Sequence, residues 1–231
     1  MPKVRLREVV RATPRTRVLR LDLLGAPFVF QAGQAVMVGL ADSASRSAYS
    51  IASAPSLAST GILELLVPAD GLFGEFGLDP EQVVGQLLAV EGPFGSFGVP
   101  AEATSAPLLL VGGGTGIAPL RSVALARAEQ TDAAPMVLVY SARTPDEFAF
   151  GDEFAALTRQ RRLRVATTVT RDDRAADWTG RSGRIDDALL AAALPAGDAW
   201  CLVCGPAGLV GTVTASLEGL GVSGARIVVE R

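Results

Sequence analysis

Apolar and polar residues alternate with a period of two through much of the first hundred residues of the chain. Val4 and Leu6 flank an arginine, and Leu19, Leu21 and Leu23 are separated by single charged residues. This period is typical of β-strands that bury one face. Further short strands are expected at 28–30, 35–38 and 62–67, with turn segments at 25–27, 31–34 and 69–71. Short strands with regular turns predict an antiparallel barrel or sandwich over residues 1–100.

The pattern changes after a short linker at 101–106. Residues 108–111 are continuously apolar, as expected of a strand that is buried on both faces. Further strands are expected at 136–140, 163–169, 200–203 and 226–230, and helices at 120–127, 147–159, 186–193 and 207–220. This alternation predicts βαβ units on a parallel sheet over residues 106–231.

Composition removes several kinds of chemistry. The 231 residues carry a net charge of -3 and include no histidine, so neither a nucleic-acid-binding surface nor a catalytic or metal-binding histidine is expected. Cys201 and Cys204 are too few for an all-cysteine metal or iron–sulfur site. Gly and Pro interrupt the long apolar stretches, so no membrane span is expected, and the expected location is the cytoplasm.

A glycine-rich turn follows the first strand of the second half. Its residues are Gly112, Gly113, Gly114, Thr115 and Gly116, and Pro119 follows where the next helix is expected. Glycines let the backbone bend tightly and approach a ligand, and the free N–H groups at a helix start suit a pyrophosphate. The turn is neither a G-x-G-x-x-G fingerprint nor a Walker A loop. Taken alone it indicates a phosphate-bearing ligand without naming one, or a flexible turn with no ligand.

Four segments, in order, resemble motifs of the ferredoxin–NADP reductase family. Residues 112–119 resemble its pyridine-nucleotide motif, and residues 46–50 (Arg-Ser-Ala-Tyr-Ser) resemble its Arg-x-Tyr-Ser flavin motif. Residues 91–97 resemble the segment that closes the flavin barrel, and 204–206 resemble the Cys-Gly-Pro turn. The resemblance implies an antiparallel β-barrel flavin-binding domain at 1–100, followed by an α/β parallel-sheet nucleotide-binding domain at 106–231.

The resemblance also assigns the flavin site. Arg46 would neutralise a cofactor phosphate, Tyr49 would offer its ring and hydroxyl to the flavin, and Ser50 would hydrogen-bond near the flavin nitrogen that receives hydride. Without the resemblance, Arg46 and Tyr49 fit a solvated charge and a sheet residue equally well. The remaining residues of the expected site are Ser47, Ala48, Gly71, Phe73, Gly74 and Glu75. Gly74 stands where the family often has Ser or Thr, and FAD is expected rather than FMN.

On the nicotinamide side, the resemblance places Thr115 near the pyrophosphate or nicotinamide and Cys204 against the reacting nicotinamide carbon. Glu230 would complete the redox centre with Ser50 and Cys204, and Gly205 and Pro206 would form the adjoining turn. Cys201 and Cys204 also read as C-x-x-C, but Cys201 lies in an apolar run instead of at a helix start, which disfavours a redox disulfide.

The choice between NADPH and NADH depends on cations for the ribose 2′-phosphate. Arg143 follows the second expected strand of the parallel sheet, and Arg171 and Arg184 resemble arginines that hold this phosphate in bacterial members of the family. These residues favour NADPH over NADH, although surface arginines near helix ends would look the same in sequence.

The implied activity is hydride transfer from NAD(P)H to bound FAD, followed by electron transfer to a ferredoxin, a flavodoxin or an oxygenase component. The acceptor would be a separate protein, since the cysteines of a ferredoxin domain are lacking in this sequence. Three alternatives stay open: a free-flavin reductase, an electron-transfer subunit of a larger complex, and a non-catalytic nucleotide sensor.

Overall fold

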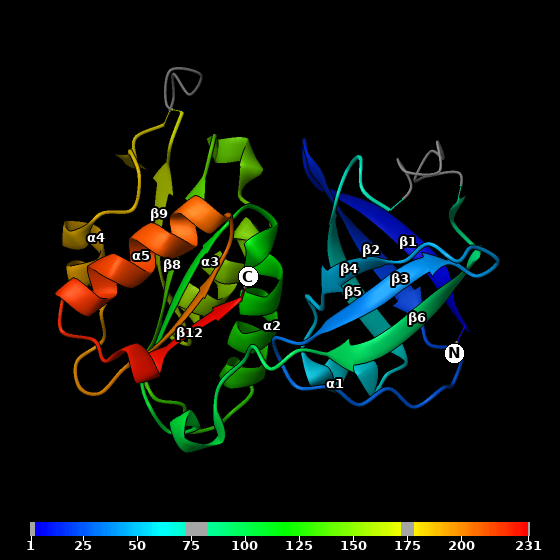
Figure 1. The fold of residues 1–231 in the computed structure, drawn as a ribbon, viewed down its shortest axis with the longest axis horizontal. Helices are drawn as coiled ribbons and strands as arrows, with labels where there is room; N and C mark the ends of the chain where they lie inside the picture. The colour runs from blue at the N-terminus through cyan, green and yellow to red at the C-terminus, as the bar shows by residue number, and fades with distance from the viewer. Residues whose placement is uncertain (1–2, 73–82, 172–177, 231) are drawn as a thin grey trace.

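The computed structural model describes residues 3–72, 83–171 and 178–230, and these form two six-stranded sheets that lie side by side (Figure 1). The strands of the first sheet are β1 (Lys3–Thr13), β2 (Thr16–Asp22), β3 (Ala35–Leu40), β4 (Ser47–Ser50), β5 (Ile62–Pro68) and β6 (Leu87–Phe94). Their order is β4-β3-β6-β1-β2-β5, and every neighbouring pair is antiparallel.

The alternating pattern of the sequence forms the interior of this first sheet. Leu6, Leu19 and Leu21 are fully buried and pack in one cluster, because every second residue of a strand faces the same side. The two edge strands approach each other through an isolated bridge between Ile51 and Leu65. The sheet is therefore barrel-like, but the hydrogen-bonded ladders of the described residues do not close it.

The second sheet is parallel throughout. Its strands are β7 (Leu108–Gly113), β8 (Met136–Ala142), β9 (Arg164–Val169), β10 (Arg181–Ser182), β11 (Trp200–Cys204) and β12 (Ile227–Glu230). Their order is β10-β9-β8-β7-β11-β12, so β7, with its continuous apolar run, is central and buried on both faces. The expected antiparallel-then-parallel architecture is confirmed.

Helices cover both faces of the parallel sheet. On one face, α2 (Ile117–Ala128) and α3 (Gly151–Arg159) pack with Leu108, Leu110 and Leu138. On the other face, α4 (Asp187–Ala193) and α5 (Ala207–Gly219) pack with Leu109 and Val111. A short helix, α1 (Pro55–Ala58), follows β4 in the first half.

The two halves share one apolar interface. Val18 and Leu66 of the antiparallel sheet lie in the same buried cluster as Leu120 and Val123 of α2. Helix α2 therefore lies between the two sheets, and the end of β12 reaches the boundary between them (Figure 1).

Two details of the sequence-based expectation are wrong. Residues 28–30 form no strand, although Phe30 is buried and Val29 is exposed, because they pair with no neighbouring strand among the described residues. The helix expected at 147–159 begins only at Gly151, because Phe150 has a left-handed backbone (φ 62°) and the segment Pro145–Glu147 forms a separate 3-10 turn.

Candidate active site between the two sheets

The carboxyl ends of three parallel strands meet at one edge of the second sheet. Cys204, the last residue of β11, is in register with Gly112 of β7 on one side and with Glu230 of β12 on the other. Parallel α/β sheets bind ligands at this edge, because the loops and helix N-termini that follow the strands gather there. The register alone therefore places three of the expected site residues next to one another.

The antiparallel sheet brings Ser50 to the same point. The Ser50 hydroxyl, at the end of β4, donates to Glu230 at 3.2 Å from Oε1 and 3.3 Å from Oε2. The Cys204 thiol donates to Glu230 Oε2 at 3.1 Å. Ser50, Cys204 and Glu230 thus form one hydrogen-bonded cluster, although Ser50 and Glu230 are 180 positions apart in the chain.

The thiol of this cluster is protonated at neutral pH. Cys204 is 7% exposed, and burial together with the neighbouring Glu230 carboxylate raises the pKa of its thiol well above the ordinary value. Both effects disfavour the thiolate, so Cys204 acts as a neutral hydrogen-bond donor.

The glycine turn packs directly on the Cys204 turn. A Cβ atom on Gly116 would lie 2.5 Å from the Cys204 carbonyl oxygen, and Gly205 in turn approaches Gly113. Gly114 has a left-handed backbone (φ 59°), and Gly114–Gly116 form a 3-10 turn that leads into α2. Pro119 is buried in the first turn of that helix, where it needs no N–H partner. Glycine is required here for close backbone approach.

The expected flavin residues of the 46–50 segment lie on β4 and immediately before it. In this structure Arg46 Nη1 donates to the carbonyl oxygens of Leu40, Ser43 and Ser45 at 3.3, 2.5 and 2.8 Å, and Nε lies 3.4 Å from Glu91 Oε1. The Arg46 side chain is only 13% exposed, and its Nη1 hydrogen bonds hold it against the backbone of residues 40–45.

The rest of the expected flavin site is described in part. Ser47, Ala48 and Tyr49 pair with β3, and Ala48 is exposed. A Cβ atom on Gly71 would lie 3.1 Å from the Tyr49 hydroxyl, so the small residue at 71 makes room for the tyrosine. Phe73, Gly74 and Glu75 lie outside the described residues.

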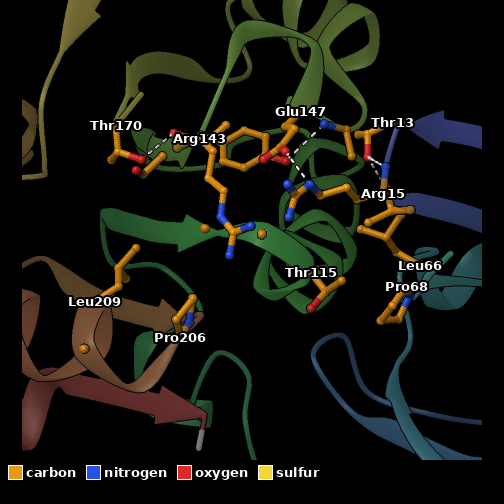
Figure 2. A pocket seen from close by; sticks show the side chains of 18 of the residues that line it. Thr13, Arg15, Leu66, Pro68, Thr115, Arg143, Glu147, Thr170, Pro206 and Leu209 are labelled. Atoms are coloured by element: carbon orange, nitrogen blue, oxygen red, sulfur yellow. Dashed lines mark hydrogen bonds and ion pairs between the residues drawn. The ribbon is translucent and has the colours of Figure 1, made fainter. Parts of the chain in front are cut away.

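A cavity of about 780 Å³ opens between the two halves beside the glycine turn (Figure 2). Of the expected nucleotide-site residues, those that line it are Gly113, Gly114, Thr115, Arg143, Arg184 and Pro206. The volume suits a dinucleotide-sized ligand. Arg171 does not line the cavity: its side chain is exposed, and its backbone N–H donates to the Arg143 carbonyl at 2.8 Å.

Comparisons with known proteins agree with this geometry. Residues 110–215 match the family model described as the oxidoreductase NAD-binding domain. A solved cytochrome P450 reductase of Amycolatopsis, GcoB, is 26% identical, with 99% of this chain and 68% of that chain covered at a TM-score of 0.84. The chain shares the two-domain fold of the ferredoxin–NADP reductase-like oxidoreductases.

Two further proteins are similar to this chain, one in structure and one in sequence. A ferredoxin–NADP⁺ reductase from Neisseria gonorrhoeae, solved with bound FAD and NADP, shares the fold at 22% identity and a TM-score of 0.76, covering 99% of this chain and 97% of that chain. A flavohemoprotein of Deinococcus radiodurans is 31% identical over 117 residues, which is 49% of this chain and 29% of the flavohemoprotein. The chain thus spans less than a third of that curated relative.

Some residues that line the cavity do not belong to the site expected from the sequence. The cavity is also lined by Arg15 and Leu66 of the first sheet, and by Tyr140, Glu147 and Leu209 of the second half. Arg15 and Leu66 are far from every motif, and only the packing of the two halves brings them here. The described residues contain no group of three or more His, Cys, Asp or Glu that could hold a metal, and none of their helices is long and apolar enough to cross a membrane.

Proposed function

We propose that this chain is an NAD(P)H-dependent flavoprotein reductase that transfers hydride from NAD(P)H to FAD and then passes electrons to a separate acceptor protein. The observation that carries the proposal is the Ser50–Glu230–Cys204 cluster, formed where the antiparallel sheet meets the nucleotide-binding edge of the parallel sheet. A nicotinamide and a flavin held by the two halves would meet at that cluster.

The residues present fit both groups. Gly113, Gly114 and Thr115 line the cavity of about 780 Å³, which accommodates a dinucleotide, and a Cβ atom on Gly114 would meet no atom within 4 Å, so this turn leaves open space for a pyrophosphate. Ser50 and Tyr49 supply a hydroxyl and an aromatic ring on the flavin side. A bound flavin supplies chemistry that side chains lack, because it accepts a hydride and releases electrons singly.

The protein's contribution is alignment. Glu230 accepts hydrogen bonds from both Ser50 and Cys204, which holds the two donors at fixed positions on opposite sides of the boundary. The neutral Cys204 thiol brings no negative charge of its own to the place where a nicotinamide ring would lie. Fixed polar groups that need no rearrangement during the reaction lower its barrier.

NADPH is the proposed reductant. Arg143 points into the cavity (Figure 2), and Arg184 also lines it, so two guanidinium groups are available to a ribose 2′-phosphate. Arg171 contributes no lining surface, and this part of the proposal therefore rests on the other two arginines. FAD is proposed over FMN in keeping with the Neisseria reductase, which was solved with FAD.

The proposed acceptor is an oxygenase component, a ferredoxin or a flavodoxin. A cytochrome P450 reductase is among the similar structures, which supports an oxygenase partner. We also propose that residues 1–100 and 106–231 act as flavin-binding and nucleotide-binding domains, and that the protein works in the cytoplasm.

The test is an absorption spectrum of the purified full chain, followed by anaerobic titration with NADPH and NADH. We expect a yellow protein with about one flavin per chain. NADPH should reduce and bleach this flavin faster than NADH does. A colourless protein that reduces added free flavin would identify a free-flavin reductase instead. No reduction of bound or added flavin, and none of ferricyanide, would overturn the proposal.

A further inference from the structure

Arg15 links the antiparallel sheet to the nucleotide cavity. It lies in the turn between β1 and β2, and its Nε is 2.9 Å from Glu147 Oε1 in the second half. Both side chains line the 780 Å³ cavity, and Figure 2 shows this ion pair near the Arg143 side chain. One wall of the proposed nucleotide site therefore comes from the flavin half.

The turn that carries Arg15 is held in place by its own hydrogen bonds. The Arg15 N–H donates to Thr13 Oγ1 at 3.1 Å, and the Thr13 and Thr16 hydroxyl oxygens are 2.8 Å apart. The Arg15 carbonyl accepts from the Ala69 N–H at 2.7 Å. With its backbone bonded on both sides, Arg15 projects from a defined position, and its alignment with Glu147 follows from the fold.

Glu147 follows the second strand of the parallel sheet, where nucleotide-binding sheets carry the residue that contacts the ribose. It follows the carboxyl end of β8, the strand beside the central β7, and its side chain is 17% exposed. An acid after the second strand typically accepts hydrogen bonds from the ribose hydroxyls of NADH, whereas an arginine there accommodates the 2′-phosphate of NADPH. This cavity contains both kinds of residue, since Arg143 and Glu147 each line it.

We propose that Arg15 is a specificity-determining residue for the nucleotide: by pairing with Glu147 it neutralises a carboxylate that would repel a ribose 2′-phosphate beside Arg143. The inference rests on the proposed function, because it assigns the adenosine end of NAD(P)H to this cavity. Without Arg15, the unpaired Glu147 charge disfavours binding of the phosphorylated nucleotide and leaves binding of the unphosphorylated one unaffected. Replacing Glu147 as well removes the repulsion, so the two substitutions compensate.

Calorimetric titration with two nucleotide fragments tests this without requiring turnover. For full-length Arg15→Ala we expect the affinity for 2′,5′-ADP to fall about tenfold, as like-charge repulsion in a partly buried site implies, with less than about a twofold change for 5′-AMP. The double variant Arg15→Ala/Glu147→Gln should recover 2′,5′-ADP binding to within about twofold of wild type. Arg11→Ala is the matched control, because it removes an exposed arginine from the same hairpin that does not line the cavity.

Three outcomes would overturn the inference. If Arg15→Ala loses affinity equally for both fragments, the arginine only helps to close the cavity. If adding Glu147→Gln does not restore binding of 2′,5′-ADP, Arg15 contacts the phosphate directly. If Arg11→Ala has an effect as large as that of Arg15→Ala, the loss reflects the overall charge of the protein. The proposed function fails separately: if wild type binds 2′,5′-ADP as expected but reduces no flavin, the reductase assignment falls and the role of Arg15 stands. If wild type binds neither fragment, the nucleotide site itself is wrong and the inference falls with it.

Discussion

The two cysteines differ from free thiols because both are buried. Burial raises the pKa of Cys201 to about 11, and burial together with Glu230 raises the pKa of Cys204 further. Their ordinary value is 9.0, so in the folded protein both remain neutral at pH values where an unfolded chain begins to ionise them. Cys204 is therefore suited to donate a hydrogen bond and unsuited to act as a nucleophile.

Native protein should resist alkylation accordingly. At pH 8 the thiolate fraction of Cys201 is about a hundredfold smaller than that of an ordinary cysteine, and Cys204 ionises even less, so iodoacetamide should modify both at least that much more slowly than in urea. The rate should rise with pH up to the pKa of each thiol. Peptide mass spectrometry assigns the modified residue, and rapid labelling of Cys204 at pH 8 in the folded protein would contradict the proposed hydrogen-bond role.

For single residues of the candidate site, the sequence predicts those that belong to a motif and misses those that only the packing of the two halves brings together. Ser50, Cys204 and Glu230 each fall in a recognisable segment, and the structure brings them together. Arg15 and Glu147 belong to no such segment. They meet only because the hairpin of one sheet faces the strand ends of the other, which no local pattern encodes.

The glycine turn between β7 and α2 positions the site by close contact with the Cys204 turn. Gly116 leaves no room for a side chain, because an added Cβ would meet the Cys204 carbonyl oxygen at 2.5 Å and the Gly205 nitrogen at 2.6 Å. Both of these are backbone atoms, which cannot move aside as the tip of a flexible side chain does. The spacing of two neighbouring strand ends is thus determined by the absence of one methyl group.

Gly116→Ala should consequently separate the two turns. We expect a loss of about 1–3 kcal/mol in the free energy of unfolding, the usual cost of overpacking, and a fall in kcat because Cys204 shifts relative to Ser50. Gly211→Ala is the control: this glycine is exposed on α5 with no atom near the added Cβ, so the change should stabilise by about 0.5–1 kcal/mol. Thermal unfolding and NADPH-dependent dye reduction provide the measurements, and unaltered stability and kcat in Gly116→Ala would refute this account.

The sequence predicts the position of strands that have a strong apolar pattern, and it fails where a strand depends on pairing with a neighbouring strand. Strands β7, β8 and β11 are largely continuous apolar runs between helices, and they appear at the expected places. Residues 28–30 are a short apolar run of the kind found in strands, but they pair with no strand among the described residues. Strand β4 lies within the segment that resembles a flavin motif, and its four residues are too few for a strand period to be visible in the sequence.

A buried ionic network connects the two halves of the molecule. Arg121 on α2 donates through Nη1 to Glu64 at 2.7 Å and to the Ala52 carbonyl at 2.9 Å, both in the first half. Its Nε and Nη2 bind Glu153 on α3 at 2.5 and 3.0 Å, and its guanidinium carbon lies 4.2 Å from the Phe150 ring centre. Arg121 is 7% exposed and Glu64 is 5% exposed, so this pair is little screened by water, whereas the Glu153 side chain is 33% exposed.

This network makes the free energy of unfolding depend on pH in the acidic range. Burial alone would raise the pKa of Glu64, but Arg121 and Arg20 outweigh it and hold the pKa of that carboxyl below its ordinary value of 4.5. The carboxylate is thus favoured in the folded state. Its stabilising contribution is present above about pH 4.5 and is lost as the pH falls through the lower, folded-state pKa.

Arg121→Met should therefore lower the stability of both halves of the molecule and not of the second half alone. Removing one partner leaves Glu64 buried with only Arg20, and the free energy of unfolding should fall by about 3–5 kcal/mol at pH 7. Adding Glu64→Gln should recover part of that loss, since the uncompensated charge disappears. The single variant Glu64→Gln should lack the part of the wild-type decline below pH 4.5 that comes from this carboxyl. Urea denaturation at pH 7 and pH 4 measures both effects. If Arg121→Met is as stable as wild type at pH 7, the network does not hold the halves together, and the alignment of Ser50 with Glu230 must depend on the apolar interface around α2.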